Sequence, residues 1–130
     1  MGIDCSANGN NAIAMGIQSR SVAGTADLAI GNRAWAEGID LYGNGIPNPG
    51  LKIGAIALGT DISAVGYAAI AIGYRNDALG NHAIAIGNGD TGGGVNEAHG
   101  VQSIAIGQLN KAYVPDHHFQ NHYIYSLKLK

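Results

Sequence analysis

The chain has 130 residues, enough for one domain, but its 21 glycines, one Phe and one Trp exclude an ordinary compact core of large side chains. Seven basic and nine acidic residues give a formal net charge of -2, which argues against nucleic acid as a partner. Apolar runs of about five residues are far too short to span a bilayer, and the first residues lack the apolar core of a secretory signal, so no direct membrane insertion is expected.

Residues 1–11 precede the regular pattern and are expected to form a lead-in or cap. Cys5 is the single cysteine of the chain, which excludes an internal disulfide. It is interpreted as a buried or idle thiol, with an intermolecular bridge as the alternative.

From residue 12 onward the chain repeats itself. The motif Ala-Ile-Ala-x-Gly or a close variant recurs at 12–16, 28–31, 55–59, 69–73, 83–87 and 103–107, and a second motif, Ala-x-Gly, lies halfway between at 36–38, 64–66, 78–80 and 98–100. Glycine disfavours a helix, whereas alternating Ile and Ala closed by Gly is typical of short strands followed by turns. Each fourteen residues is therefore expected to form one coil of an all-β solenoid. The predicted repeat turns are Gly31, Gly59, Gly66, Gly73, Gly80, Gly87 and Gly107.

The alternation gives each strand one large-residue face and one small-residue face. We expect the large residues to fill the roll interior: Ile13, Ile30, Ile56, Ile70, Ile72, Ile84, Ile86, Ile104 and Ile106. The small apolar face is then expected to pack against identical chains, with a trimer interface formed by Ala14, Ala29, Ala57, Ala71, Ala85 and Ala105.

Two stretches interrupt the repeat. Residues at about 42–52 contain two of the three prolines, and residues 88–97 lengthen the interval from Gly87 to Gly107 to twenty. Both are expected to be insertions within a repeat domain that covers 12–112. Residues 113–130 abandon the pattern and are expected to form a C-terminal cap or docking segment.

These paired motifs resemble the head repeats of trimeric autotransporter adhesins of the YadA type over about residues 12–112. The resemblance implies a left-handed parallel β-roll in a parallel homotrimer that binds host matrix or cells. Similar repeats occur in bacteriophage fibre proteins, which need no secretory signal. Nothing in the sequence resembles the neck, coiled-coil stalk or membrane anchor of the adhesins.

The favoured function is therefore a bacteriophage virion fibre or fibre tip that attaches to the host cell surface. Its expected partners are other fibre or virion proteins and a host receptor, either protein or glycan. The alternatives are the head of a bacterial adhesin at the cell surface and a purely structural spacer.

No enzymatic activity and no cofactor are expected, because the titratable residues are scattered among turns. An acyltransferase of the hexapeptide-repeat class is disfavoured, because a six-residue rung does not match a period of fourteen. His117, His118 and His122 are weak metal-site candidates, since a trimer would triple each imidazole, but solvent-facing or cap-contact histidines are the better explanation because their spacing is not diagnostic of a metal site. Aromatic and basic side chains at the turns suggest ligand contacts at Trp35, Tyr42, Tyr67, Tyr74 and Arg75.

Overall fold

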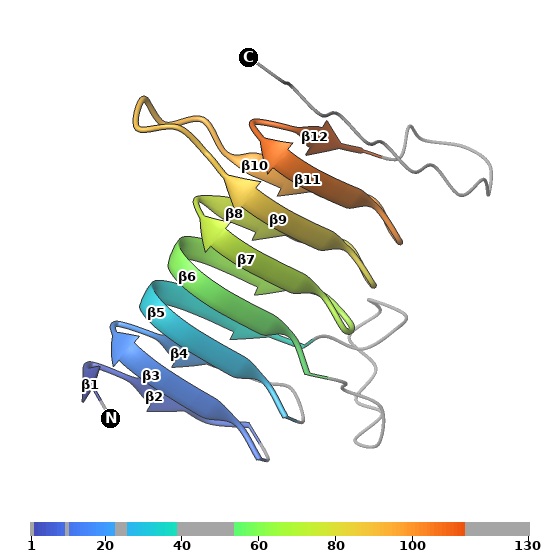
Figure 1. Ribbon diagram of the computed structural model, residues 1–130. Coiled ribbons are helices and arrows are strands. Elements are labelled where there is room, and N and C mark those ends of the chain that lie inside the picture. Colours follow the sequence, from blue (N-terminus) through green and yellow to red (C-terminus); the bar gives the residue numbers. More distant parts are fainter. Residues whose placement is uncertain (1, 10, 23–25, 39–53, 114–130) are drawn as a thin grey trace.

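The computed structural model describes residues 2–9, 11–22, 26–38 and 54–113, and within them every regular element is a β-strand (Figure 1). The strands are β1 (Gly2–Ile3), β2 (Ser6–Ala7), β3 (Ile13–Ile17), β4 (Arg20–Ser21), β5 (Leu28–Glu37), β6 (Ile56–Val65), β7 (Ile70–Tyr74), β8 (Asn76–Ala78), β9 (Ile84–Asn88), β10 (Asn96–Ala98), β11 (Ile104–Gln108) and β12 (Lys111–Ala112).

The strands stack into two parallel walls. The front wall contains β1, β3, β7, β9, β11 and the first halves of β5 and β6, in the order β1-β3-β5-β6-β7-β9-β11. The back wall contains β2, β4, β8, β10, β12 and the second halves of β5 and β6, which bend through the corner between the walls. The chain runs leftward along the front wall and returns rightward behind it as it climbs, which is a left-handed winding (Figure 1). The predicted all-β parallel roll is confirmed.

Strand register follows the repeat. Ile56 pairs with Ile70 and Ile70 with Ile84, so one coil takes fourteen residues. The step from β9 to β11 takes twenty residues, since Ile84 pairs with Ile104. The step from β5 to β6 takes twenty-eight, since Leu28 pairs with Ile56. The roll therefore keeps its ladder across segments of unequal length.

The hydrophobic interior is made almost entirely of alanine, which overturns the predicted assignment of the two faces. Of the predicted interface alanines, five are fully buried inside the roll, and Ala14 in an early coil is half-buried: Ala29, Ala57, Ala71, Ala85 and Ala105 are 0% exposed. None of the predicted interior isoleucines is buried. Ile13, Ile30 and Ile106 are 49%, 37% and 39% exposed, and Ile56, Ile70, Ile72, Ile84, Ile86 and Ile104 are half-buried on the outside.

The back wall explains this arrangement. Its inward positions are again small, with Ala36, Ala64, Ala78, Ala98 and Ala112 aligned in one ladder of buried residues. Two walls that both point alanine inward pack closely, and the space between these alanine ladders is too narrow for a column of isoleucines; the one buried isoleucine of the described residues, Ile62, lies in register with Ala34 beside the corner. The isoleucines of the front wall must then point outward, because successive side chains of a strand alternate in direction.

Polar side chains complete the interior where the front wall turns into the back wall. Asn76 is fully buried, and its Nδ2 donates hydrogen bonds to the carbonyl oxygens of Ile72 at 2.5 Å and Gly87 at 2.7 Å. Ser19 makes the equivalent bonds to Met15 and Gly31. These side chains satisfy carbonyl groups that the bend leaves without a strand partner.

A column of glycines precedes the same corner. Gly31, Gly59 and Gly73 pair in register, have φ between 124° and 143°, and a Cβ on any of them would run into the carbonyl oxygen of the next glycine in the column. Only glycine fits this combination of positive φ and close backbone approach. Gly87 and Gly107 continue the column, whereas Gly66 and Gly80 lie at the opposite corner.

Asp27 closes the interior beside the long step from β5 to β6. Its carboxylate is 1% exposed, and Oδ1 accepts hydrogen bonds from the backbone N–H groups of Gly38 at 3.1 Å and Ala55 at 2.8 Å. One buried side chain thus holds both the residue where the chain leaves the ladder and the residue near which it returns. The predicted insertion at about 42–52 lies outside the described residues.

The second insertion is anchored at both ends. Gly89 donates its N–H to the carbonyl oxygen of Tyr74, so it occupies the ladder position that Arg75 has in the preceding coil. Since Asn96 pairs with Asn76, the six residues 90–95 are the excess over a regular coil. Arg75 Nη1 donates to the carbonyl oxygen of Asp90 at 2.6 Å, and Asp90 Oδ1 accepts from the N–H of Gly94 at 2.6 Å.

Candidate interaction surfaces

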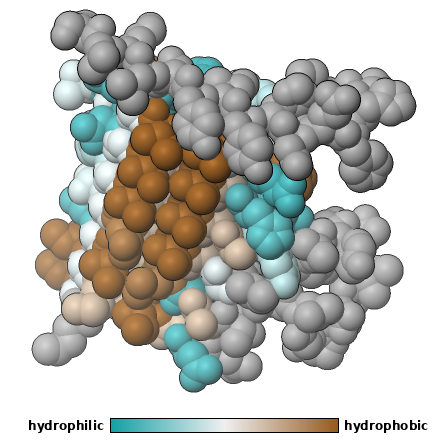
Figure 2. Space-filling view, turned by 45° about the vertical axis from the view of Figure 1, so that its right-hand side comes forward, coloured by the Kyte–Doolittle hydropathy of each residue, from teal (hydrophilic) through white to brown (hydrophobic). Residues whose placement is uncertain are grey.

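The outward face of the front wall is an apolar band of two side-chain columns. The strand register places Ile13, Leu28, Ile56, Ile70, Ile84 and Ile104 in the first column, and Met15, Ile30, Leu58, Ile72, Ile86 and Ile106 in the second. We call these twelve residues the apolar face. Figure 2 shows their side chains as a continuous hydrophobic band that follows the long axis of the roll.

This band is unusual for a surface. Contiguous apolar patches of more than a few hundred Å² are rare on monomeric proteins and mark sites of association. Complete burial of one Ile or Leu side chain is worth about 1.5–3 kcal/mol, so the partly exposed columns retain a large driving force for association. The third outward position of these strands is mostly polar, with Asn32, Thr60, Tyr74 and Asn88 in register, and it borders the band.

The outward face of the back wall is more polar, although it includes Val65 and Leu79. One column of it contains Arg20, Trp35, Ser63, Asp77, Glu97 and Lys111. We call this column the polar face.

Charged groups interact near the C-terminal end of the polar face. Glu97 lies 3.4 Å from Lys111 Nζ and 3.8 Å from His99 Nε2, and it accepts a hydrogen bond from the Tyr113 hydroxyl. Partial burial acts to raise the pKa of Glu97, but the Tyr113 hydrogen bond and the Lys111 charge outweigh it and hold that pKa below its ordinary value. Burial raises the pKa of Asp77, and the neighbouring Glu97 charge adds to the rise against a hydrogen bond from Ser63.

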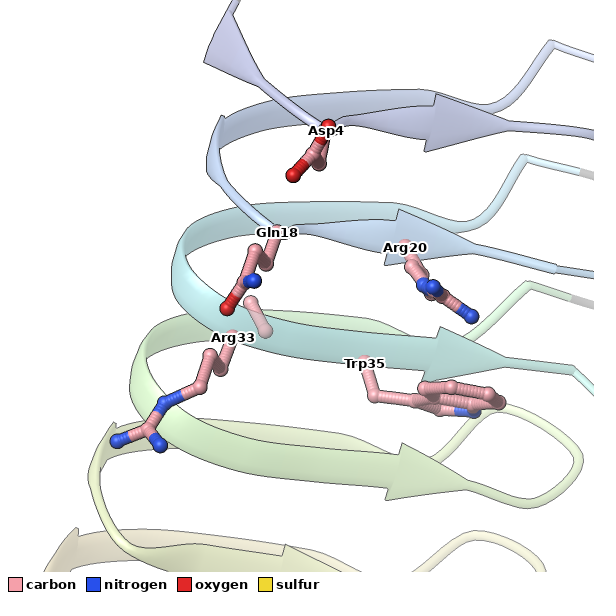
Figure 3. A pocket seen from close by; sticks show the side chains of 6 residues that line it. Asp4, Gln18, Arg20, Arg33 and Trp35 are labelled. Atoms are coloured by element: carbon pink, nitrogen blue, oxygen red, sulfur yellow. The ribbon is translucent and has the colours of Figure 1, made fainter.

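A hollow of about 440 Å³ opens at the other end of the polar face, beside the corner of the early coils (Figure 3). It is lined by Asp4, Gln18, Arg20, Arg33, Ala34 and Trp35. The Arg20 guanidinium carbon lies 5.8 Å from the centre of the Trp35 ring, within cation–π range. Arg33 Nη2 donates to Asp61 Oδ2 at 2.7 Å, and in Figure 3 its side chain points away from Trp35.

The structure separates the predicted ligand contacts. Trp35 lies on the back wall, whereas Tyr74 and Arg75 lie together at the corner, with the guanidinium carbon 5.4 Å from the ring centre. Tyr67 lies at the opposite corner and packs edge-on against His82, with ring centres 5.1 Å apart. Tyr67 and Tyr74 are half-buried rather than fully exposed. The remaining predicted contact, Tyr42, lies outside the described residues.

Arg20 and Gln18, which lie beside Trp35 in the hollow, are not among the ligand contacts predicted from the sequence. A signal was available, because Arg20 stands four residues after Gly16 and Trp35 four residues after Gly31, and these glycines pair in register. The step between them is fifteen rather than fourteen residues, which hid the correspondence.

The described part of the chain contains no group of three His, Cys, Asp or Glu side chains that could hold a metal ion. His117, His118 and His122 lie outside it. None of the described residues forms a helix long and apolar enough to cross a membrane.

Coils of about fourteen residues, a glycine corner and an alanine interior define a parallel β-roll of the solenoid repeat class. The sequence model of the YadA head domain repeat matches in two copies, over residues 6–22, 64–89 and 98–113. The resemblance predicted from the motifs is therefore confirmed, and the chain carries YadA-like head repeats. No curated protein and no solved structure gave a significant match.

Proposed function

We propose that the chain is a non-enzymatic module of a homotrimeric surface fibre, and that the apolar face lies at the centre of the trimer. The observation that carries the proposal is the band of twelve outward Ile, Leu and Met side chains along the front wall. The match to the YadA head domain repeat supports this proposal, because the resemblance to trimeric adhesins implies a homotrimer.

An identical chain is the best occupant of this face. The band runs through six successive strands with the same side-chain spacing, and a parallel copy presents the same spacing over the same length. The polar face is directed away from such a contact, which leaves it available to solvent and ligands.

Sedimentation of the purified full chain tests the trimer. We expect a species of three times the 13.3 kDa chain mass. Ile72→Glu combined with Ile86→Glu would place six charges at the trimer centre and is expected to yield monomers. Leu79→Glu is the matched control, because it makes the same exchange at a half-buried position after β8 on the other wall and should leave the trimer intact. A wild-type monomer, or a trimer that survives the double substitution, would refute the proposed interface.

For the biological context we favour a bacteriophage virion fibre or fibre tip that attaches to the host cell, with a bacterial adhesin head as the alternative. The sequence after Ala112 leaves the repeat pattern, which suits docking to another fibre protein. Antibody detection of the chain in purified virions, compared with bacterial envelope fractions, separates the two settings.

A structural spacer is the third possibility, and loop deletion distinguishes it from an attachment module. Removal of 90–95 leaves Gly89 next to Asn96 and restores a fourteen-residue coil, with glycine at the corner position where Arg75 has a φ of 53°. The variant should therefore fold. Labelled full-length chains with and without the loop are then compared on bacterial cells and on immobilised extracellular matrix. Loss of attachment supports a binding role for the loop, and unchanged attachment excludes it.

A further inference from the structure

The hollow beside Trp35 has the construction of a small-ligand site. At the corner, Asp4, Gln18 and Arg33 have positive φ and stand in one column. Two residues further along their coils, Arg20 and Trp35 form the column of the polar face. The residue between, such as Ala34, points into the roll, so a trough remains between the two outward columns. Its volume of about 440 Å³ is within the usual range for ligand pockets.

Trp35 supplies an apolar wall to this trough. The ring is half-buried, and its Nε1–H donates to Glu37 Oε2 at 3.1 Å, which fixes its orientation. Trp35 pairs in register with Ser63 of β6. Because serine is small, no large side chain at this position of the column covers the ring. A large, oriented aromatic ring is well suited to pack against the C–H face of a ligand.

Arg20 supplies a positive charge to the trough. Among the described residues its guanidinium contacts the Trp35 ring and forms no ion pair, in contrast to Arg33, which is paired with Asp61. A planar guanidinium binds a carboxylate through two parallel hydrogen bonds. In Figure 3 the Arg20 side chain reaches toward Trp35, so the charge and the ring lie next to each other.

The remaining lining residues narrow the ligand class. Gln18 offers both donors and an acceptor, and Asp4 offers acceptors only, which together suit the hydroxyl groups of a sugar. The Asp4 charge on the same trough disfavours ligands with more than one negative charge, such as phosphate. We propose that the trough binds a sugar bearing one carboxylate, with the carboxylate on Arg20 and the ring beside Trp35.

This inference rests on the proposed attachment function and names the class of receptor, an acidic glycan. Trp35 is the single tryptophan of the chain, so intrinsic fluorescence of the full-length protein reports on the trough directly. Titration with D-glucuronic acid at constant ionic strength is expected to give a saturable fluorescence change. Glucose, which lacks the carboxylate, and acetate and phosphate, which lack the sugar ring, should give none in the same range.

Variants assign the effect to the trough. Arg20→Gln retains the fluorophore and is expected to weaken glucuronate binding at least about tenfold. Lys111→Gln is the matched control, because it removes one positive charge from the same column at its other end, where Lys111 is paired with Glu97, and its titration should match the wild type. An equal response to acetate or phosphate, or an unchanged titration for Arg20→Gln, would overturn the acidic-sugar site. No response to glucuronate from a chain that still attaches to cells would overturn this inference alone, whereas loss of both would also remove the attachment function.

Discussion

The apolar face and the polar face stand back to back on one backbone ladder and share one alanine interior. On the front wall the residues flanking Ala71 are Ile70 and Ile72, whereas on the back wall Ala78 is flanked by Asp77 and Leu79. The inward residues are thus nearly constant, while one of the two outward columns changes from isoleucine to polar and charged residues. The comparison teaches that the small residues specify this fold, and that its large apolar residues are available for association.

Exchanging the size of inward and outward residues gives the largest expected effect. Ala71→Leu places three extra carbon atoms between two closely packed walls and should destabilise the roll by about 3 kcal/mol or more. Ile72→Leu, one residue further on the outward face, should change stability by less than about 1 kcal/mol. Chemical denaturation of both variants provides the measurement. Equal effects at the two positions would contradict the assignment of the interior.

Asp27 provides a second test, of how the shared interior is closed. Asp27→Ala removes two hydrogen bonds to a buried carboxylate and should cost about 3 kcal/mol. Asp61→Asn is the control, because it removes the ion pair with an Arg33 side chain that is 60% exposed and keeps a residue type that tolerates the φ of 53° at this position; such surface pairs contribute about 0.5 kcal/mol. The two melting curves should separate clearly. A milder effect at position 27 than at position 61 would show that the buried contacts do not hold the ends of the long step.

The smallest expected effects concern two neighbours on the polar face with opposite pH dependence. The raised pKa of Asp77 means that its stabilising contribution is complete below the unfolded pKa and is lost as pH rises through the folded value. Asp77→Asn should therefore gain melting temperature relative to wild type as pH rises from 3 to 7, by roughly 1–3 °C.

Glu97 has the reverse sign. Its lowered pKa means that it stabilises the fold above the unfolded pKa and loses that contribution as pH falls through the folded value. Glu97→Gln should therefore melt at a lower temperature than wild type at pH 7, and the difference should shrink toward pH 3. Melting curves of both variants across this range test the pair together. If the melting temperature of each variant differs from that of the wild type by the same amount at every pH, the charges of this face are screened by solvent.

The sequence was sufficient to predict the coils, because glycine spacing and strict alternation depend only on local geometry. It was also sufficient for the parallel architecture, since residues fourteen apart carry the same side chains. The sequence-based prediction of which side chains point into the roll was wrong, because the size of the inward residues depends on the wall that faces them. Ala64 and Ala78 already indicated a small inward face there, and isoleucine on the other wall would have had no large apolar partner to meet.

The polar contacts were beyond sequence reasoning for a different reason. Asn76, Asn96 and Asn110 repeat at one corner position and bond backbone carbonyl groups there, but Ser19 fills the equivalent position in an early coil and unequal coil lengths separate the three asparagines. The trough beside Trp35 likewise depends on register across an irregular step of fifteen residues. Such sites are produced by the stacking of coils and have no signature within any one coil.

The direct pairing of β5 with β6 has a consequence for how proteins of this kind change length. Nine register pairs join these strands although twenty-eight residues separate them, and Asp27 holds Gly38 and Ala55 side by side. Adding residues between Gly38 and Ala55 would leave the height of every later coil unchanged. The segment between Gly38 and Ala55 is therefore a natural graft site, at which a foreign peptide could be displayed at one fixed level of the roll.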